Sequence, residues 1–510
     1  MKLNKTKNTI RNIIFGVITK IVQLILPFVI RTVFIYTLGI EYLGLNSLFT
    51  SILSVLSLSE LGIGSAMVFS MYKPLADGDT DTICALMNLY RKCYRIIGLV
   101  ITSIGILLLP FLQYLIHGKV PVGINIYIIY LITLFGTSIT YFLFAYKNCI
   151  LQVYQRNDII NKITVCLSLI QYTLQITILI FLKNYYCYLF VVPLISASNN
   201  IVIAFIVSRK YRQYTPIGKV PKSIIDNIKK RVYALVLYKI GGIVLNSVDN
   251  IVISACLGLT ILAVYNNYYY IITAIFGFLS IISLSMLAGV ANSIVTESVE
   301  KNYNDFKTFL FMDLWIVGWC AITLFCLYQP FMKLWVGVDY MFSDITVLLI
   351  TILFYVWRIG DIVGVYKDGL GMWFEDRFRP FIGAVVNLVV NIILVNIIGI
   401  NGVILSSIIS ILTITFPIAA LTLFKNYFHI SSKEFFFIQI KHFLIVLTGG
   451  ICTYLLCNLV TINSFVGLFI RMLICIIVPN VIMLLFYHRS QQFGVAKIFV
   501  KNIIKRKSKL

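Results

Sequence analysis

The chain has 510 residues, of which 60% are hydrophobic and only 12% charged, and its mean hydropathy is +0.95. Soluble domains carry roughly 25% charged residues, so this composition excludes a water-soluble globular protein and predicts an all-α integral membrane protein. The formal net charge of +23 does not indicate a nucleic-acid partner, because no long Lys/Arg block or recognition motif accompanies it.

Scattered cysteines and histidines predict no metal site. No two of the eleven cysteines have the two-residue spacing of a zinc or redox site, and the four histidines have no partner at ligand spacing. We interpret the cysteines as small apolar residues, and we expect neither a metal nor another cofactor. The first apolar run, residues 12–36, is too long for a signal-peptide core and is expected to be the first membrane helix.

Fourteen segments are long and apolar enough to cross a membrane, which takes about 20 residues per helix. The tight turn at Ile400 and Asn401 separates two of them. The predicted spans are residues 12–37, 43–72, 94–116, 124–146, 159–182, 188–208, 233–257, 260–292, 307–330, 345–366, 381–400, 401–424, 441–461 and 465–487.

The distribution of Lys and Arg predicts the orientation. With a cytoplasmic N-terminus, the cytoplasmic segments and the span ends that adjoin them carry 34 Lys/Arg residues, and the external loops carry three. Positive residues are retained on the cytoplasmic side, so both termini are expected there. The two most basic segments, 209–231 and 488–510, either enforce this topology or lie on anionic lipid headgroups.

The two halves of the chain match at a shift of 219 residues. Lys20-Ile21 falls on Lys239-Ile240, and Leu38-Gly39 falls on Leu257-Gly258. An even number of spans gives both halves the same orientation, as in transporters built from parallel repeats around a cavity. The predicted domains are an N-lobe (1–208), a basic linker (209–232), a C-lobe (233–424) and two extra C-terminal helices with a basic tail (425–510).

Cations inside the first helix of each half predict an anionic ligand. Lys20 and Arg31 are eleven residues apart and therefore share one helix face. The first span of the second half carries Lys239, Asn246 and Asn250. Charged groups at this depth usually face an aqueous cavity, where a cation suits a phosphate. The alternative is that Lys20 and Arg31 extend to the membrane surfaces.

Carboxylates within spans are candidates for proton or cation coupling. These are Glu60, Asp249 and Asp361. Asp361 follows Arg358 by three positions. A structural ion pair between Arg358 and Asp361 is the alternative. The run Tyr265-Asn266-Asn267-Tyr268-Tyr269-Tyr270 offers sugar-stacking rings or, alternatively, anchors at the membrane interface.

Several motifs resemble the polysaccharide-biosynthesis flippases. They are the N-terminal Lys/Asn segment, the sequence Tyr-Thr-Leu-Gly-Ile-Glu-Tyr-Leu-Gly at 36–44, Ser-Glu-Leu-Gly-Ile-Gly at 59–64, and Ser-Val-Asp-Asn at 247–250 running into Leu257-Gly258. This family belongs to the multidrug/oligosaccharidyl-lipid/polysaccharide (MOP) exporter superfamily, together with the multidrug and toxin extrusion (MATE) exporters and the lipid II flippases.

The resemblance implies a V-shaped, MATE-like transporter of two six-helix lobes that translocates undecaprenyl-pyrophosphate-linked oligosaccharides for O-antigen, capsule or exopolysaccharide synthesis. Lys20, Arg31, Lys239 and Arg358 are the positions that would hold the pyrophosphate-sugar headgroup, with Asn246 and Asn250 beside them. Expected partners are the lipid-linked substrate, H⁺ or Na⁺, membrane lipids, and the polymerase and glycosyltransferases of the same polymer.

Two other functions remain open. A MATE-type multidrug/cation antiporter would have an acidic cavity for cationic drugs. A membrane polysaccharide polymerase would carry its catalytic residues on a sizeable external loop, whereas the longest here, 331–344, has about fourteen residues. No phosphate-binding loop occurs, and Asp77-Gly78-Asp79 only approaches the spacing of a metal-binding Asp-x-Asp motif. We therefore expect a transporter and not an enzyme.

Overall fold

The protein is all-helical. A computed structural model describes residues 5–60, 62–118, 120–121, 123–372 and 374–507, and these residues contain helices and helical turns but no strand. Only the backbone is described at 5–10, 12–14, 17, 58–59, 231, 234–235, 237–246, 499–500 and 502–507. The predicted all-α class is confirmed.

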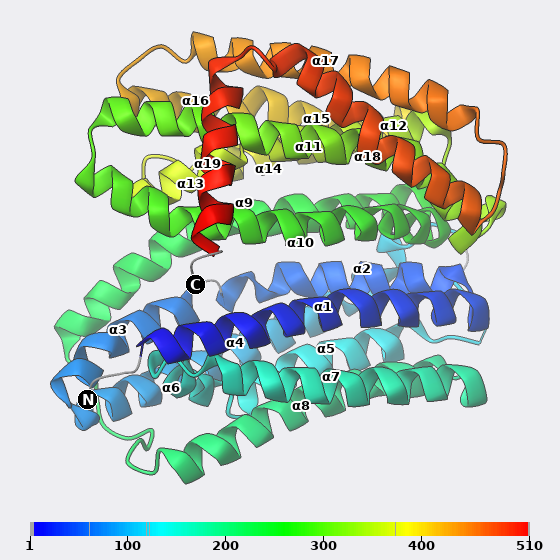
Figure 1. Ribbon diagram of the computed structural model, residues 1–510. Coiled ribbons are helices and arrows are strands. Elements are labelled where there is room, and N and C mark those ends of the chain that lie inside the picture. The colour runs from blue at the N-terminus through cyan, green and yellow to red at the C-terminus, as the bar shows by residue number, and fades with distance from the viewer. Residues whose placement is uncertain (1–4, 61, 119, 122, 373, 508–510) are drawn as a thin grey trace. The chain divides into compact units, whose positions relative to one another are not determined.

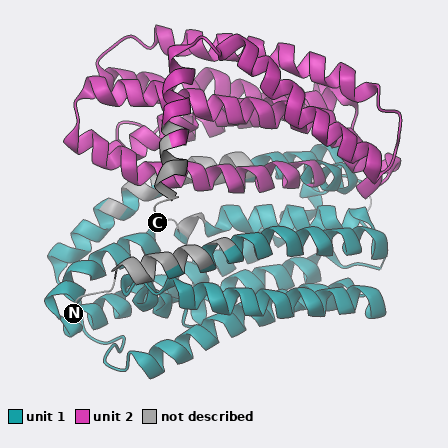
Figure 2. Cartoon of the chain, viewed as in Figure 1, with its two compact units in different colours: residues 1–266 teal, residues 267–510 magenta. Residues whose placement is uncertain are grey.

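The chain divides into two compact units, residues 1–266 and 267–510 (Figure 2). The division falls inside α10 (Leu259–Thr296) and not at the predicted linker, 209–232. The second half of that linker is helical, since α9 begins at Lys222 directly after Pro221, whose fixed φ suits the start of a helix. The predicted lobes are defined by the sequence repeat and not by contacts between residues. The limits of the lobes remain predictions.

The described residues of unit 1 form nine helices and the first two turns of α10 (Figure 1). They are α1 (Lys5–Thr37), α2 (Ile40–Leu56), α3 (Ile63–Asp77), α4 (Thr80–Leu107), α5 (Ile126–Phe142), α6 (Asn148–Val153), α7 (Asn157–Thr177), α8 (Tyr185–Lys210) and α9 (Lys222–Leu257). Within this unit α1 packs on α7, α5 packs between α4 and α8, and α2 packs on α9.

Where the structure describes unit 2, the chain forms the rest of α10 and nine further helices. They are α11 (Val299–Trp335), α12 (Asp344–Arg358), α13 (Asp361–Leu370), α14 (Arg379–Ile398), α15 (Ile400–Ser410), α16 (Phe416–Leu423), α17 (Lys433–Asn458), α18 (Phe465–Tyr487) and α19 (Gln491–Lys507). The long helix α11 is central, because α12, α17, α18 and α19 all pack on it.

The helices are long and apolar enough for a multi-pass membrane protein. Ten described helices meet the length and hydropathy required of a span, or up to twelve if each of two bent pairs crosses once. Two shorter apolar helices, Ile40–Leu56 and Ser247–Leu257, lie at the second and seventh predicted spans. The total of fourteen crossings remains a prediction.

Several predicted spans contain a break, and two of these breaks lie beside candidate site residues. The span at 43–72 is interrupted between α2 and α3 by a 3₁₀ turn, η1 (Ser57–Glu60), and by Gly62, which has a left-handed φ of 84°. The span at 345–366 is interrupted between α12 and α13 at Gly360. Hydropathy alone does not reveal these breaks, because glycine and serine lower it only slightly while they permit a change of backbone direction.

The basic C-terminal segment forms helix α19 and is not an extended tail. It packs on α11, where the rings of Trp315 and Phe493 stack with centroids 6.0 Å apart. In Figure 1, α19 runs at a steep angle to α11. The segment 488–510, whose positive charges predict a role in topology or lipid binding, thus also makes an aromatic contact with α11.

Candidate functional site

Arg31 and Asn250, two of the predicted site residues, belong to one hydrogen-bonded network in unit 1. Arg31 Nη1 donates to the backbone oxygen of Asn266, at 2.8 Å. The Asn266 side chain donates to Asn250 Oδ1 at 3.2 Å, and Asn250 Nδ2 donates to Ser51 Oγ at 2.8 Å. We call these four residues, which come from α1, α2, α9 and α10, the Arg31 network.

Glycines let these helices approach one another. A side chain at Gly44 on α2 would place its Cβ 2.1 Å from the backbone oxygen of Leu259. Gly258 joins α9 to α10 with a φ of 92°, which side chains rarely allow. Gly44 and Gly258 belong to the motifs that carried the family resemblance, so those motifs position the helices around the network.

The Arg31 network combines a cation with neutral hydrogen-bonding groups. A guanidinium is planar and presents a fork of donors that matches the oxygens of a phosphate. Asparagine amides both donate to and accept from hydroxyl groups, as sugars require. The half-buried position of Arg31 strengthens its electrostatic interactions relative to those of a cation in water.

The other predicted residues of the first helices are Lys20, Lys239, Asn246 and Asp249. Lys20 is exposed on α1, roughly 16 Å along the helix axis from Arg31. Asp249 is buried on α9. Lys239 and Asn246 lie on α9, but their side chains are outside the described part of the structure.

Glu60 forms a second polar cluster in unit 1. Its carboxylate accepts hydrogen bonds from the hydroxyls of Tyr94, at 2.7 Å, and Tyr141, at 2.6 Å. Tyr90 donates in turn to the Tyr94 hydroxyl, at 2.7 Å. The break after α2 makes this possible, because Glu60 ends the turn η1. We call Glu60 and these three tyrosines the Glu60 cluster.

A polar cavity of about 390 Å³ adjoins the Glu60 cluster. Side chains of α5 to α8 line it, among them Gln152, Ser168 and Gln171. The Oδ1 atoms of Asn148 and Asn199 are buried beside it without a hydrogen-bond partner in the described structure. Buried acceptors of this kind require water or a ligand donor, so the cavity suits hydrated or hydroxyl-bearing guests.

Arg358 and Asp361 form the predicted ion pair in unit 2, with Arg358 Nη2 2.5 Å from Asp361 Oδ2. Arg358 is buried, and its guanidinium lies over the ring of Phe276. Ser283 on α10 donates a hydrogen bond to Asp361. The pair joins the end of α12 to the start of α13 across the break between them.

Asp313 on α11 is a candidate that the sequence analysis missed. It lines a cavity of about 620 Å³, mostly apolar, together with Asp305 and residues of α10. Asp313 Oδ2 is buried and has no hydrogen-bond partner among the described residues. The sequence carried a signal for it, because Asp313 is a carboxylate inside the predicted span 307–330, just as Asp361 lies inside the predicted span 345–366.

Asp158 and Asp376 are buried carboxylates that each pair with two cations. Asp158 contacts Arg11 and Arg156, both at 2.9 Å. Asp376 contacts Lys367 and, at 2.6 Å, Arg379. Each lies near the start of the helix that follows a junction, α7 in unit 1 and α14 in unit 2. These clusters cross-link helices within their units and explain four of the cations.

The structure shows the local role of two further sequence features, the Tyr/Asn run at 265–270 and the Asp-Gly-Asp sequence at 77–79. Tyr265, Asn267 and Tyr268 are buried, which is not expected of anchors that face the membrane interface. Asp77-Gly78-Asp79 is a turn between helices: Gly78 ends α3, and the Asp79 side chain caps α4 by accepting from Thr82 N at 2.9 Å. Hydrogen bonds from Thr82 lower the pKa of this exposed Asp79.

The predicted cations do not converge within one unit. Arg31 belongs to unit 1 and Arg358 to unit 2. The single cavity that Lys20, Arg31, Lys239 and Arg358 were expected to share therefore remains a prediction.

The fold is that of the MOP transporters. It is similar to the lipid II flippase MurJ in an inward closed conformation, with a TM-score of 0.64 and 16% identity over 94% of this chain and 99% of that one. It is also similar to an inward-facing MATE family multidrug resistance transporter, with a TM-score of 0.56 and 15% identity over 78% of this chain and 92% of the other. A third similar structure is a MOP superfamily transporter from Pyrococcus furiosus. Its TM-score is 0.54 and its identity 16%, over 84% of this chain and 96% of the other.

No protein-family model and no curated protein sequence matches the chain. The likeness is therefore one of structure, at identities that establish the fold alone.

Proposed function

We propose that this chain is a flippase that moves undecaprenyl-pyrophosphate-linked oligosaccharide units across the bacterial cytoplasmic membrane for surface polysaccharide synthesis. The observation that carries the proposal is the Arg31 network within a MOP-type fold, in which a guanidinium bonds the backbone of Asn266 and the side chains of Asn266 and Asn250 bond each other. That combination suits a headgroup with a pyrophosphate at one end and sugar hydroxyls at the other.

The transport mechanism would be alternating access. The headgroup passes through a cavity between two lobes while the polyprenyl tail stays in the bilayer. In this proposal Lys20, Arg31, Lys239 and Arg358 contact the phosphates, and Asn246 and Asn250 contact the sugars. Both termini face the cytoplasm, and a polymerase uses the translocated units on the other side.

Glu60, Asp249 and Asp361 are the proposed coupling residues, and we add Asp313 to this proposal. A carboxylate inside a membrane protein can take up H⁺ or Na⁺ and so link substrate movement to an ion gradient. The chain contains no nucleotide-binding loop. The proposal therefore assigns the driving force to an ion gradient or to consumption of the product, and not to ATP.

A MATE-type cation antiporter is the second candidate. The Glu60 cluster and Asp313 favour it, because both place a carboxylate beside a cavity where an organic cation or a proton could bind. The charge of the transported group distinguishes the two functions: the flippase would move an anionic headgroup and the antiporter a cation.

The test is translocation in proteoliposomes that contain a fluorescent undecaprenyl-pyrophosphate oligosaccharide. A membrane-impermeant quencher reports how much of the lipid has changed leaflet. The intact protein is expected to move the lipid, and Arg31→Ala to slow it roughly 10- to 100-fold, as befits loss of a charged hydrogen bond worth about 1.5–3 kcal/mol. Arg31→Lys should recover part of the rate.

Lys73→Ala is the matched control, since Lys73 is an exposed cation on α3 outside every site described above. It should transport like the intact protein. If the intact protein leaves the lipid-linked sugar in place but expels a cationic dye against an imposed proton gradient, the flippase proposal fails and the antiporter replaces it.

A further inference from the structure

Three cysteines from three helices of unit 2 meet in its interior. They are Cys326 on α11, Cys457 on α17 and Cys475 on α18, with exposed fractions of 4%, 2% and 0%. All three sulfur atoms lie within 4.8 Å of one another, and those of Cys457 and Cys475 are 3.9 Å apart. We call them the cysteine cluster. Among the described residues it is the only group of cysteine, histidine or carboxylate side chains with ligand spacing.

Neighbouring contacts hold the three helices in place independently of the thiols. Trp319 Nε1 on α11 donates to the backbone oxygen of Cys475, at 2.9 Å. Arg471 on α18 donates to the backbone oxygens of Cys457, at 3.3 Å, and Val460, at 2.5 Å. These bonds connect α18 to both partners, so the sulfur atoms converge on a preformed scaffold.

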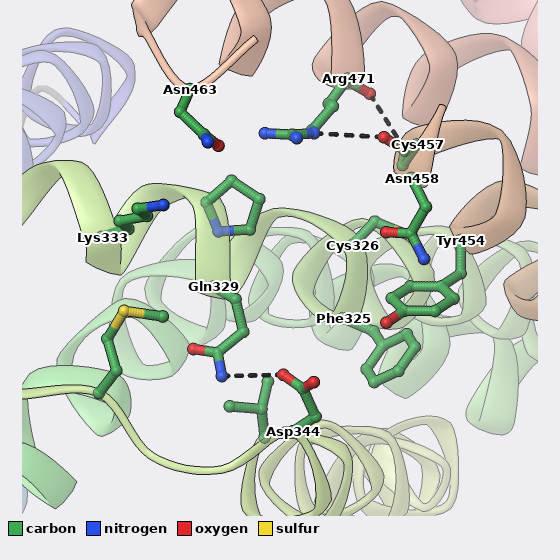
Figure 3. Close-up of a pocket in the computed structure, with 13 residues that line it drawn as sticks. Phe325, Cys326, Gln329, Lys333, Asp344, Tyr454, Cys457, Asn458, Asn463 and Arg471 are labelled. Carbon is green, nitrogen blue, oxygen red and sulfur yellow. Dashed lines mark hydrogen bonds between the residues drawn. The ribbon is translucent and has the colours of Figure 1, made fainter. Parts of the chain in front are cut away.

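A cavity of about 250 Å³ adjoins the cluster (Figure 3). Cys326 and Cys457 line it together with charged and amide side chains. In Figure 3 the Arg471 guanidinium lies beside the Cys457 backbone, and Gln329 and Asp344 are joined by a hydrogen bond of 3.0 Å elsewhere in the cavity. The cavity therefore adjoins two of the three cysteines.

The sulfur spacing fits a metal ion. Metal–sulfur bonds of about 2.3 Å require sulfur atoms roughly 3.8–4.0 Å apart in tetrahedral or trigonal arrangements. One pair is already at 3.9 Å, and the upper limit of 4.8 Å leaves less than an ångström to close for the others. Rotation of a cysteine side chain moves its sulfur farther than this.

The donor set selects the kind of ion. Three sulfurs with no imidazole or carboxylate in the group suit a soft ion, whereas Ca²⁺ and Mg²⁺ require oxygen ligands. Structural Zn²⁺ takes four ligands, and no fourth cysteine, histidine or carboxylate of the described residues joins this group. Cu(I) is soft and accepts three sulfur ligands, so it is the best match.

We propose that the cysteine cluster binds one soft, thiophilic metal ion of the Cu(I) class, which ties the α17–α18 hairpin to α11. Binding replaces thiol protons by the ion, and the protons are released to solvent. The guanidinium of Arg471, which lines the same cavity, offsets the negative charge of the thiolates. This site is independent of the substrate and coupling residues proposed above.

A disulfide is the competing explanation. Cys457 and Cys475 are close enough for modest side-chain rotation to bring their sulfurs to about 2.05 Å. A disulfide would engage two sulfurs and does not account for the third, Cys326, at the same point. It also would not require the cavity.

The test uses the purified full-length protein, reduced and then kept under anaerobic conditions, which is titrated with Cu(I) in competition with a chromophoric Cu(I) chelator. The intact protein should withdraw one Cu(I) per chain. Cys326→Ser, Cys457→Ser and Cys475→Ser should each weaken binding by more than about 100-fold, since loss of outer-shell partners alone costs roughly 10- to 100-fold. Cu(I) should also raise the unfolding temperature of the intact protein and not that of these variants.

Cys320→Ser on α11 and Cys452→Ser on α17 are matched controls, because they lie on the same helices outside the cluster. Both should bind Cu(I) like the intact protein. The unfolding temperature without metal shows whether each variant is folded. The proposal is overturned if the intact protein binds Cu(I) no better than folded Cys326→Ser, if the controls lose binding equally, or if mass spectrometry of protein isolated from membranes without reductant finds a Cys457–Cys475 disulfide.

Discussion

Gly39 and Gly258 lie 219 residues apart and adopt the same unusual backbone conformation. Gly39 has φ 104° and ψ 163° between α1 and α2, and Gly258 has φ 92° and ψ 173° between α9 and α10. These angles fall in a region that is essentially restricted to glycine. The sequence match between the two halves thus corresponds to one helix–turn–helix geometry that occurs twice.

Substitution of either glycine should destabilise the protein. Gly258→Ala forces alanine into the restricted region and brings a Cβ within 3.0 Å of the His117 backbone oxygen, so we expect a loss of ~1–3 kcal/mol of folding stability. Gly39→Ala should lose about as much from strain alone, because nothing lies within 4 Å of its added Cβ. The midpoint of thermal unfolding in detergent measures both effects.

Gly277→Ala is the control for this pair, since Gly277 is helical and an added Cβ meets nothing within 4 Å. It should be neutral or slightly stabilising. Equal melting temperatures for Gly258→Ala and Gly277→Ala would show that the turn does not depend on glycine.

The middle of the Arg31 network should be sensitive to loss of its hydrogen bonds. Asn250→Leu leaves Ser51 and Asn266 without the amide that joins them, and we expect a cost of about 1–3 kcal/mol in stability. The same variant should lower the lipid translocation rate. Asn396→Leu is the matched control, because Asn396 is exposed and bonds only within its own helix. A variant at Asn250 that keeps both normal stability and normal transport would remove the network from the site.

Glu60→Gln tests ion coupling with little change in shape. The amide keeps one oxygen to accept from a tyrosine, but its nitrogen only donates, so the bond to the other tyrosine must reverse its direction. If Glu60 carries the coupled proton, the folded variant should transport at a rate that no longer responds to an imposed proton gradient. Glu41→Gln, at an exposed glutamate on α2, should retain the response of the intact protein.

The buried carboxylates Asp158 and Asp376 should differ in their contributions to stability. The side chains that pair with Asp376 are 6% and 14% exposed, whereas those that pair with Asp158 are 25% and 23% exposed. Breaking a buried pair costs about 3–5 kcal/mol, and solvent screening reduces this for exposed cations. Asp376→Asn should therefore lower the unfolding temperature more than Asp158→Asn. The reverse order would contradict the ranking by burial, and Glu300→Gln, on the exposed start of α11, should change little.

Much of the architecture could be predicted from sequence. Apolar length determines where a helix can cross a bilayer, since an unsatisfied backbone is too costly in lipid, and this property is local along the chain. The predicted boundary at Ile400 and Asn401, for example, is found as the turn at Gly399 between α14 and α15. The repeat and the Arg358–Asp361 pair could also be predicted, because they depend on spacing alone.

What only the tertiary structure decided are contacts between distant segments. The break that places Glu60 against Tyr94 and Tyr141 depends on packing of α2 on α4 and α5, and hydropathy averages over it. The backbone of Asn266 meets Arg31 from 235 residues away. Cys326, Cys457 and Cys475 look like isolated apolar residues in sequence and become a cluster only where α11, α17 and α18 meet. Periodicity and composition indicate which residues are buried. Which residue a buried side chain contacts depends on how the helices pack in three dimensions.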